Sequence, residues 1–464
     1  ATTTETITLT PDTEGAQTIS GTASNILDVV NGSFTGLESD VEATASGNTS
    51  VANVILLTAA TTGAVTATVT ETDVDTLTTL TASEVNVLTI QIGDRDATIA
   101  ELNTIADATT DAGSIDFGDV ETTSGTLDAA NTLFVDNADK FTALHTIDVT
   151  ITGDTLDAGT LAAVNTPIEA EGNGSITIDA STFTGTASEL EDVLDGNLGA
   201  VTGVGGDEAV TVSGTDEGVL DIAGVVTTLL DNDLATAPAA GTALTSGLIT
   251  IASDVETITG TWAEVHAGLT LNTERSDADD TTGVETPLIS GLDGLAIELD
   301  DGEDNTLTNI NDIIDNYDVG VVTAEIPAAA AISEFTDEDD GLRSGNAITV
   351  TATGEAADSS AVLAEDVVAL AALTSGAITL NDGVEAEDGS FGEVTITGSL
   401  EDLVAIYGND SIAAAASAVT ISDEGLISAS EFVAVSEETS GLITAASVTT
   451  VSGTAADVVT SLGE

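Results

Sequence analysis

The chain has 464 residues, of which 81 are acidic and 4 basic, and it has a formal charge of −77. A surface this negative repels phosphate backbones and anionic lipid headgroups, which excludes nucleic-acid binding and membrane binding through a basic patch. Since cysteine is absent, disulfides and thiolate metal sites are excluded too. The 42% apolar residues still provide a core, and with only 2% aromatics that core must consist of small aliphatic side chains.

The compartment is indicated by two features. No stretch approaches the ~18 apolar residues of a membrane span, so we expect no membrane insertion. The sequence opens on Ala1 and contains no methionine, which favours removal of a signal segment and export to the cell surface.

Residues 1–15 differ in pattern from the remaining chain. Threonines alternate with Ile7 and Leu9, and Pro11 then interrupts the pattern, which predicts an N-terminal strand without an obvious hairpin partner. Such a strand can join the sheet of a neighbouring subunit through Ile7 and Leu9, or it can pair within its own chain. Residues 1–15 are therefore a candidate donor strand for a homopolymer, with intrachain pairing as the alternative.

A degenerate repeat fills the remaining chain, which we divide into repeat regions at 16–200, 201–345 and 346–464. In each copy an alternating Thr/Ile/Val strand meets a glycine, then a threonine or serine, then a short amphipathic helix. The irregular spacing of the copies predicts a repeat of ~60 to 70 residues, with one masked copy at Thr308–Ile310. The clear copies lie at 18–23, 183–187, 258–262, 396–400 and 451–455, with a weaker copy at 123–127.

The residue types of the motif explain its expected structure. The hydroxyl after the glycine caps the next helix, and an acid three residues later completes a capping box. This pattern occurs at Thr186/Glu189, Thr261/Glu264, Ser399/Asp402 and Thr454/Asp457. Other helices run into Thr-Ser-Gly, where the glycine is the expected C-terminal stop. We therefore predict a mixed α/β repeat protein in which short strands alternate with short capped helices in a solenoid-like, β-rich stack.

The repeats resemble a known class of sequence. Residues 56–69, together with the helices that begin Thr-Gly-Thr-Ala, are similar to the degenerate Thr/Ala/Gly/Asp-rich repeats of large secreted surface proteins of marine bacteria, especially cyanobacteria. The similarity extends from about residue 50 to the C-terminus. It implies an adhesin, filament or surface-layer role outside the cell and supplies no catalytic residues. The shorter length of this chain favours a self-assembling subunit.

Calcium is the one ligand that the sequence favours. Hard oxygen ligands, which Ca²⁺ prefers, crowd two acidic loops. The candidate ligands are Asp300, Asp301, Glu303, Asp304, Asp337, Asp339 and Asp340. His145 and His266 lie in different repeats without a paired histidine, and we expect structural roles for both.

These patterns predict a non-enzymatic extracellular structural protein, a subunit of a self-assembling surface filament or layer. The alternative is a calcium-dependent secreted adhesin. A hydrolase is the third choice because the sequence carries no nucleophile, phosphate-binding or zinc motif. Between subunits of charge −77, we expect interfaces that are apolar or strand-paired, with cations screening the remaining charge.

Overall fold

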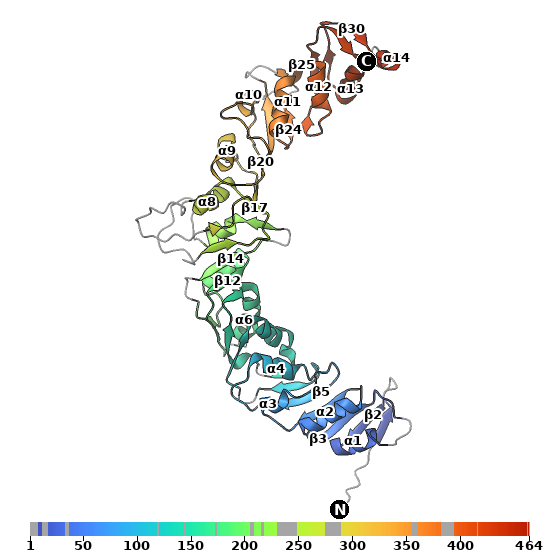
Figure 1. The fold of residues 1–464 in the computed structure, drawn as a ribbon, viewed down its shortest axis with the longest axis vertical. Coiled ribbons are helices and arrows are strands. Elements are labelled where there is room, and N and C mark those ends of the chain that lie inside the picture. Colours follow the sequence, from blue (N-terminus) through green and yellow to red (C-terminus); the bar gives the residue numbers. More distant parts are fainter. Residues whose placement is uncertain are drawn as a thin grey trace, which may run out of the picture. The chain divides into compact units, whose positions relative to one another are not determined.

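The computed structural model describes residues 8–11, 17–32, 37–117, 120–142, 144–171, 174–204, 208–214, 218–229, 248–273, 289–354, 361–381, 394–414, 416–461 and 463 (Figure 1). By its contacts the chain divides into an N-terminal body, 1–212 with 244–248, and a C-terminal body, 213–243 with 249–464. The three repeat regions expected from the sequence stay predictions.

The N-terminal body consists of short strands in open sheets, with helices between them. The first sheet has the order β1-β2-β3-β4-β5-β6-β8 and is parallel from β2 onward. Its strands are Thr8–Pro11, Gln17–Gly21, Glu42–Thr49, Val65–Val69, Val87–Gln91, Ser114–Asp116 and Phe141–Thr142. A second parallel sheet contains β7 (Thr122–Thr126), β9 (Asp148–Thr152), β11 (Ile176–Ile178) and β13 (Val201–Thr202), and a third contains β10 (Thr155–Asp157), β12 (Thr182–Gly185) and β14 (Ala209–Val212).

Helices follow most of these strands. They are α1 (Ala23–Val30), α2 (Val51–Ala60), α3 (Val74–Leu77), α4 (Ile99–Ala106), α5 (Leu127–Asn131), η1 (Thr132–Asp136), η2 (Ala138–Lys140), η3 (Leu144–Thr146), α6 (Ala158–Glu171) and α7 (Ala187–Leu194).

The C-terminal body repeats this construction. Its longest sheet has the order β15-β17-β19-β20-β22-β24-β26, at Val219–Asp221, Thr257–Gly260, Ala296–Leu299, Val322–Glu325, Ala347–Thr353, Ile378–Leu380 and Ile412–Ala413, with β21 (Ala330–Ala331) beside β22. β16 (Ile249–Ile251) pairs in parallel with β18 (Ile289–Ser290). Two further sheets contain β23 (Ala361–Leu363), β25 (Thr395–Gly398), β27 (Ala418–Ile421) and β29 (Ile443–Thr444), and β28 (Gly425–Ser428) and β30 (Val448–Ser452), respectively. The helices are η4 (Gly224–Leu229), α8 (Trp262–Thr273), α9 (Leu307–Asn316), α10 (Ile332–Phe335), α11 (Ala364–Leu373), α12 (Leu400–Tyr407), α13 (Ala429–Glu438) and α14 (Ala455–Ser461).

The fold is therefore mixed α/β with many short parallel strands, as predicted, and none of its described sheets closes into a barrel. We use "β/α repeat" for one strand, the helix that comes after it and the segment leading to the next strand of the same sheet. Such repeats bury aliphatic side chains between strand and helix. In β4, for example, Val65, Ala67 and Val69 point inward while the threonines between them face outward.

The N-terminal strand has a partner that the sequence did not reveal. Its described part, β1, pairs antiparallel with β2, and Leu9 lies opposite Ile19. Of the two pairings left open by the sequence, the structure thus has the intrachain one. Ile7 lies outside the described residues.

Two of the four predicted capping boxes are complete, at Thr186 and Thr261, whereas the hydroxyls of Ser399 and Thr454 cap their helices by bonding to the amide and the carboxylate of the acid three residues later. The Thr186 amide donates to Glu189 Oε2 at 2.8 Å, and the Glu189 amide donates back to Thr186 Oγ1 at 3.4 Å. Thr261 and Glu264 repeat this exchange at the start of α8. The supposed masked copy at Thr308–Ile310 is helical, but the capping hydroxyl belongs to Thr306, two residues earlier.

At inner repeats, the glycine before the cap allows two β/α repeats to approach closely. A Cβ on Gly453 would lie 2.9 Å from the Cβ of Ala429, the first residue of the helix in the preceding repeat, and a Cβ on Gly398 would overlap Ala364 in the same way. Gly21 belongs to the first repeat, and a Cβ there would meet nothing nearer than 3.9 Å.

The Thr-Ser-Gly segments connect neighbouring repeats. The helix ends before the threonine, so the glycine is not the C-terminal stop that we expected. Helix α11 ends at Leu373, and the extended Thr374 donates its hydroxyl to Ile348 O at 2.7 Å and accepts the Ile348 amide at 2.8 Å. A Cβ on Gly376 would overlap the backbone of Ile348. The glycine therefore provides room for a neighbouring strand, and the threonine bonds to that strand.

Candidate functional site

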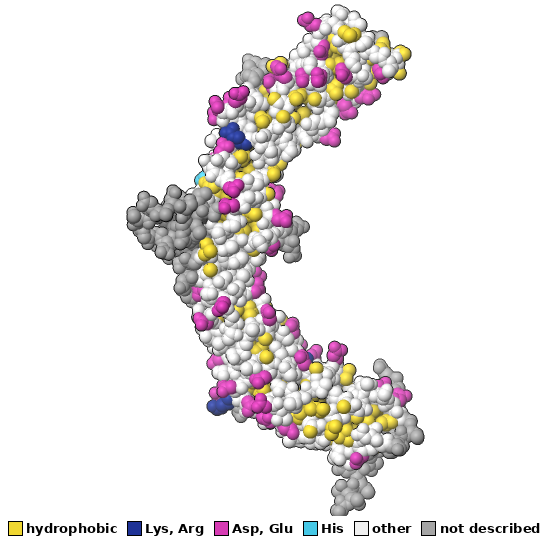
Figure 2. All heavy atoms as spheres, in the orientation of Figure 1, with side chains coloured by type: hydrophobic (Ala, Val, Ile, Leu, Met, Phe, Trp, Pro, Cys, Tyr) yellow, Lys and Arg dark blue, Asp and Glu magenta, His cyan; other side chains and the backbone are white. Residues whose placement is uncertain are grey.

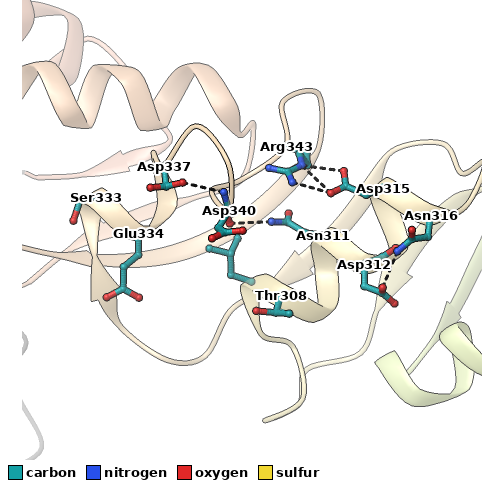
Figure 3. Close-up of a pocket in the computed structure, with 11 residues that line it drawn as sticks. Thr308, Asn311, Asp312, Asp315, Asn316, Ser333, Glu334, Asp337, Asp340 and Arg343 are labelled. Atoms are coloured by element: carbon teal, nitrogen blue, oxygen red, sulfur yellow. Dashed lines mark hydrogen bonds and ion pairs between the residues drawn. The ribbon is translucent and has the colours of Figure 1, made fainter.

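The candidate site is an open pocket of ≈ 780 Å³ between α9 and the segment that runs from α10 to Arg343 (Figure 3). Buried side chains fix both walls, namely Ile310 and Ile313 on α9, and Ile332 and Phe335 on α10. The lining is Leu307, Thr308, Asn311, Asp312, Asp315, Asn316, Ser333, Glu334, Asp337, Asp340 and Arg343. Five carboxylates thus face one guanidinium, which makes the pocket strongly negative.

The structure brings the second predicted loop to this pocket. Asp337 and Asp340 line it, and Asp337 Oδ1 accepts the amides of Asp339 and Asp340, both at 2.9 Å. Because these two bonds stabilise the ionised form, the pKa of Asp337 lies below its ordinary value. Asp339 contributes its backbone, and its carbonyl accepts a bond from Arg343 at 3.0 Å.

The first predicted loop lies elsewhere. Asp300, Asp301, Glu303 and Asp304 are all exposed between β19 and α9, and none of them lines the pocket. Two of their backbone carbonyls accept hydrogen bonds from asparagine side chains nearby in the chain. Asp300 O accepts Asn305 Nδ2 at 2.8 Å, and Asp304 O accepts Asn309 Nδ2 at 2.7 Å.

Arg343 holds the two walls of the pocket together. Its guanidinium donates to both oxygens of Asp315 on α9, with the shortest contact at 2.7 Å, and to Gly341 O at 3.0 Å. This pairing lowers the pKa of Asp315 and raises the pKa of Arg343. One of the four basic residues is therefore used to fix this corner of the C-terminal body.

Asn311, which the sequence did not single out, is the unusual group of the pocket. It is 7% exposed, and its Nδ2 donates to Asp340 O at 3.1 Å and Gly341 O at 2.9 Å. Its Oδ1 is buried without a hydrogen-bond partner among the described residues. Buried amide oxygens are normally satisfied, so this atom is an acceptor open to a cation or a water molecule. The only signal in the sequence is that Thr308, Asn311, Asp312 and Asp315 are spaced to share one helical face.

His266 has the structural role expected of it. It stacks on Trp262 with ring centroids 4.9 Å apart, and its Nε2 lies 3.2 Å from Asp312 Oδ2. Tyr317 meets the imidazole edge-on, so the ring fills the contact between α8 and α9. The side chain of His145 lies outside the described residues.

The arrangement can attract cations without forming a closed metal cage. Over the described part of the chain, no three His, Asp or Glu side chains are arranged to hold a metal ion. The carboxylates of Glu334 and Asp340 have no hydrogen-bond partner among the described residues, and Figure 3 shows Glu334 and Asp312 on opposite sides of Thr308. A cation here would be bound by one or two carboxylates together with carbonyl oxygens and water.

Comparisons of the chain with protein-family models, curated proteins and solved structures find no match. In the described residues, no helix is long and apolar enough to cross a bilayer.

Proposed function

We propose that this chain is a non-enzymatic structural protein of the cell surface, a subunit that assembles with its own copies into a filament or layer. The observation that carries the proposal is that most described strands pair in parallel with the strand of the next β/α repeat. Repeats that contact mainly their neighbours are typical of solenoid-like stacks. Such stacks present long surfaces and strand edges, and both suit assembly.

The titration of the carboxyl groups supports a structural role. The pKa values of Asp73, Asp315 and Asp337 all shift downward. In each case a hydrogen bond to the ionised carboxylate is the main cause, because it stabilises the charged form. These three carboxylates therefore act as acceptors that fix turns and helix ends.

The high negative charge of the chain favours surroundings that are rich in cations. Figure 2 shows acidic side chains spread along the face in view, and the whole chain has 81 of them. At low ionic strength this charge opposes contact between copies, whereas at marine salt the screening length falls below ~10 Å. An extracellular setting with abundant sodium, magnesium and calcium therefore favours assembly.

Electron microscopy of the purified chain tests the proposal. We expect regular fibres or sheets in about 0.5 M NaCl, with or without millimolar calcium, because the charge is then screened. Monodisperse particles under all of these conditions, at concentrations up to the solubility limit, would contradict self-assembly.

The acidic pocket favours one alternative function, calcium-dependent adhesion. Here we propose that Ca²⁺ binds in the pocket through Glu334 or Asp340, with Asn311 Oδ1 as a further ligand after a small shift. Titration calorimetry at the same salt concentration should show calcium heat that Asp340→Asn reduces and that Asp301→Asn, in the first acidic loop, leaves unchanged. The absence of heat, together with an unchanged melting temperature, would reject the site in both loops.

A further inference from the structure

A cluster of side chains that can bind a metal ion lies at the contact between α8 and α9 (Figure 1). His266 belongs to α8 and Asp312 to α9, and Tyr317 is the residue at which the chain leaves α9. The Nε2 atom of His266 lies 3.2 Å from Asp312 Oδ2 and 3.4 Å from the Tyr317 hydroxyl oxygen. One ring nitrogen therefore faces two oxygens.

Hydrogen bonds alone do not satisfy this arrangement. The Nε2 atom of an imidazole carries at most one hydrogen, which can point well at only one of two oxygens. If Nε2 accepts a hydrogen bond from Tyr317 instead, its lone pair faces the negative carboxylate of Asp312, which repels it. A cation placed among the three atoms attracts all of them.

The separations are close to those within a tetrahedral metal site. Zinc binds imidazole nitrogen and carboxylate oxygen at ~2.0–2.2 Å, so two of its ligand atoms lie ~3.3–3.6 Å apart. The distances from His266 Nε2 to the two oxygens are 3.2 Å and 3.4 Å. The side chains of His266 and Asp312 are 34% and 40% exposed, so an ion can reach the site and water can complete its coordination.

Further contacts hold the two oxygen ligands in place. Asn316 Nδ2 donates to Asp312 Oδ1 at 2.7 Å, which leaves Oδ2 for the contact with His266 (Figure 3). The Tyr317 hydroxyl lies 2.9 Å from Thr270 Oγ1. Bonds of this kind orient the ligands of metal sites and strengthen metal binding.

We propose that His266 Nε2, Asp312 Oδ2 and the Tyr317 hydroxyl bind one divalent transition-metal ion of the zinc or copper type. Imidazole nitrogen is a good ligand for Zn²⁺ and Cu²⁺, whereas Ca²⁺ and Mg²⁺ prefer oxygen ligands. The histidine thus distinguishes this site from the calcium site proposed for the acidic pocket. The ion joins α8 to α9, and the site does not depend on how copies of the chain assemble.

Trp262 reports on this site, because it is the only tryptophan of the chain and stacks on His266 with ring centroids 4.9 Å apart. The titration uses about 0.5 M NaCl to screen the charge and excess calcium to occupy carboxylates elsewhere. Cu²⁺ should quench the Trp262 fluorescence and saturate at one ion per chain, and excess Zn²⁺ should reverse the quenching by competition. His266→Gln should raise the copper dissociation constant at least about 10-fold. His145→Gln, which changes the only other histidine, should leave it unchanged.

Two further variants test the oxygen ligands. Tyr317→Phe preserves the ring and removes only the hydroxyl, so it should weaken copper binding by about 10-fold. Asp318→Asn is the control, because it removes an exposed charge one residue away. Circular dichroism checks that each variant is folded, and Tyr317→Phe provides the same test if His266→Gln is not.

Electron paramagnetic resonance of the copper complex identifies the ligand atoms. The wild-type spectrum should show splitting from one nitrogen, and His266→Gln should lose it. A wild-type spectrum with oxygen ligands only, quenching that does not saturate, or equal copper affinity in wild type and His266→Gln would each overturn the site.

Discussion

Glycine and threonine have specific tasks where two β/α repeats meet. Gly398 lies against Ala364, and Gly376 lies against the backbone of Ile348, in each case with no space for a further carbon. Thr374 is 7% exposed and bonds to both polar groups of the Ile348 backbone. Small and hydroxyl-bearing residues thus set how closely neighbouring repeats approach, which gives a physical reason for the Thr/Gly-rich composition.

Gly398→Ala should destabilise the C-terminal body by about 1–3 kcal/mol, because the new methyl overlaps Ala364. Gly21→Ala at the same motif position should change stability by less than about 1 kcal/mol, since its methyl would have room. Urea unfolding followed by circular dichroism measures both. Equal losses would show that backbone conformation, and not the approach of the preceding repeat, determines the glycine.

Thr374→Val should cost about 1–3 kcal/mol, because it preserves shape but removes the hydroxyl that bonds to Ile348. Thr379→Val is the control, since Thr379 is exposed on β24 and the hydroxyl there faces solvent. The fluorescence of Trp262, which lies in the same body, reports unfolding in urea. A valine at 374 that unfolds at the wild-type urea concentration would contradict the bonding role.

At the scale of helices and strands, features that depend on a few neighbouring residues could be predicted from the sequence. The caps at Thr186, Thr261 and Ser399 were found because each motif lies within about four residues of chain. Pairings between separate segments, whether near or distant in the chain, were not found. The β1 hairpin and the contact of Asn311 with Asp340 depend on how separate segments pack, and a single sequence with degenerate repeats does not specify that register.

The bond between Arg343 and Asp315 joins α9 to the segment after α10, and it should make stability depend on pH. Because the folded-state pKa of Asp315 is lowered, its contribution is present above the unfolded value of ~3.9 and is lost as the pH falls through the folded value. Arg343→Gln should therefore cost about 1 kcal/mol at pH ~7 and less at pH ~3.

Urea titrations of wild type and Arg343→Gln at both pH values, monitored by Trp262 fluorescence, provide the measurement. Arg95→Gln, in the N-terminal body and followed by circular dichroism, is the control, since its pair with Glu121 has side chains that are 70% and 63% exposed and should contribute little. A cost of Arg343→Gln that is the same at both pH values would show that its backbone bonds, and not the ion pair, account for the loss.

For the whole molecule, the charge of −77 is the dominant property. Screening shortens the range of repulsion from ~30 Å at about 0.01 M salt to ~10 Å at about 0.1 M. We therefore expect the melting temperature to rise steeply with NaCl at low salt and to level off near marine concentrations. Choline chloride at equal ionic strength should give the same curve in calorimetry. A rise with sodium alone would instead indicate specific ion sites.

The parallel pairing of strands that are close in the sequence has a consequence for folding. Paired strands are separated by roughly 20 to 40 residues, as in Thr66 with Val87 and Ile249 with Ile289. The partner of a strand is therefore available as soon as one more repeat has been synthesised. Strand pairing does not require the far end of the chain to be complete. Folding can advance in step with synthesis, one repeat at a time.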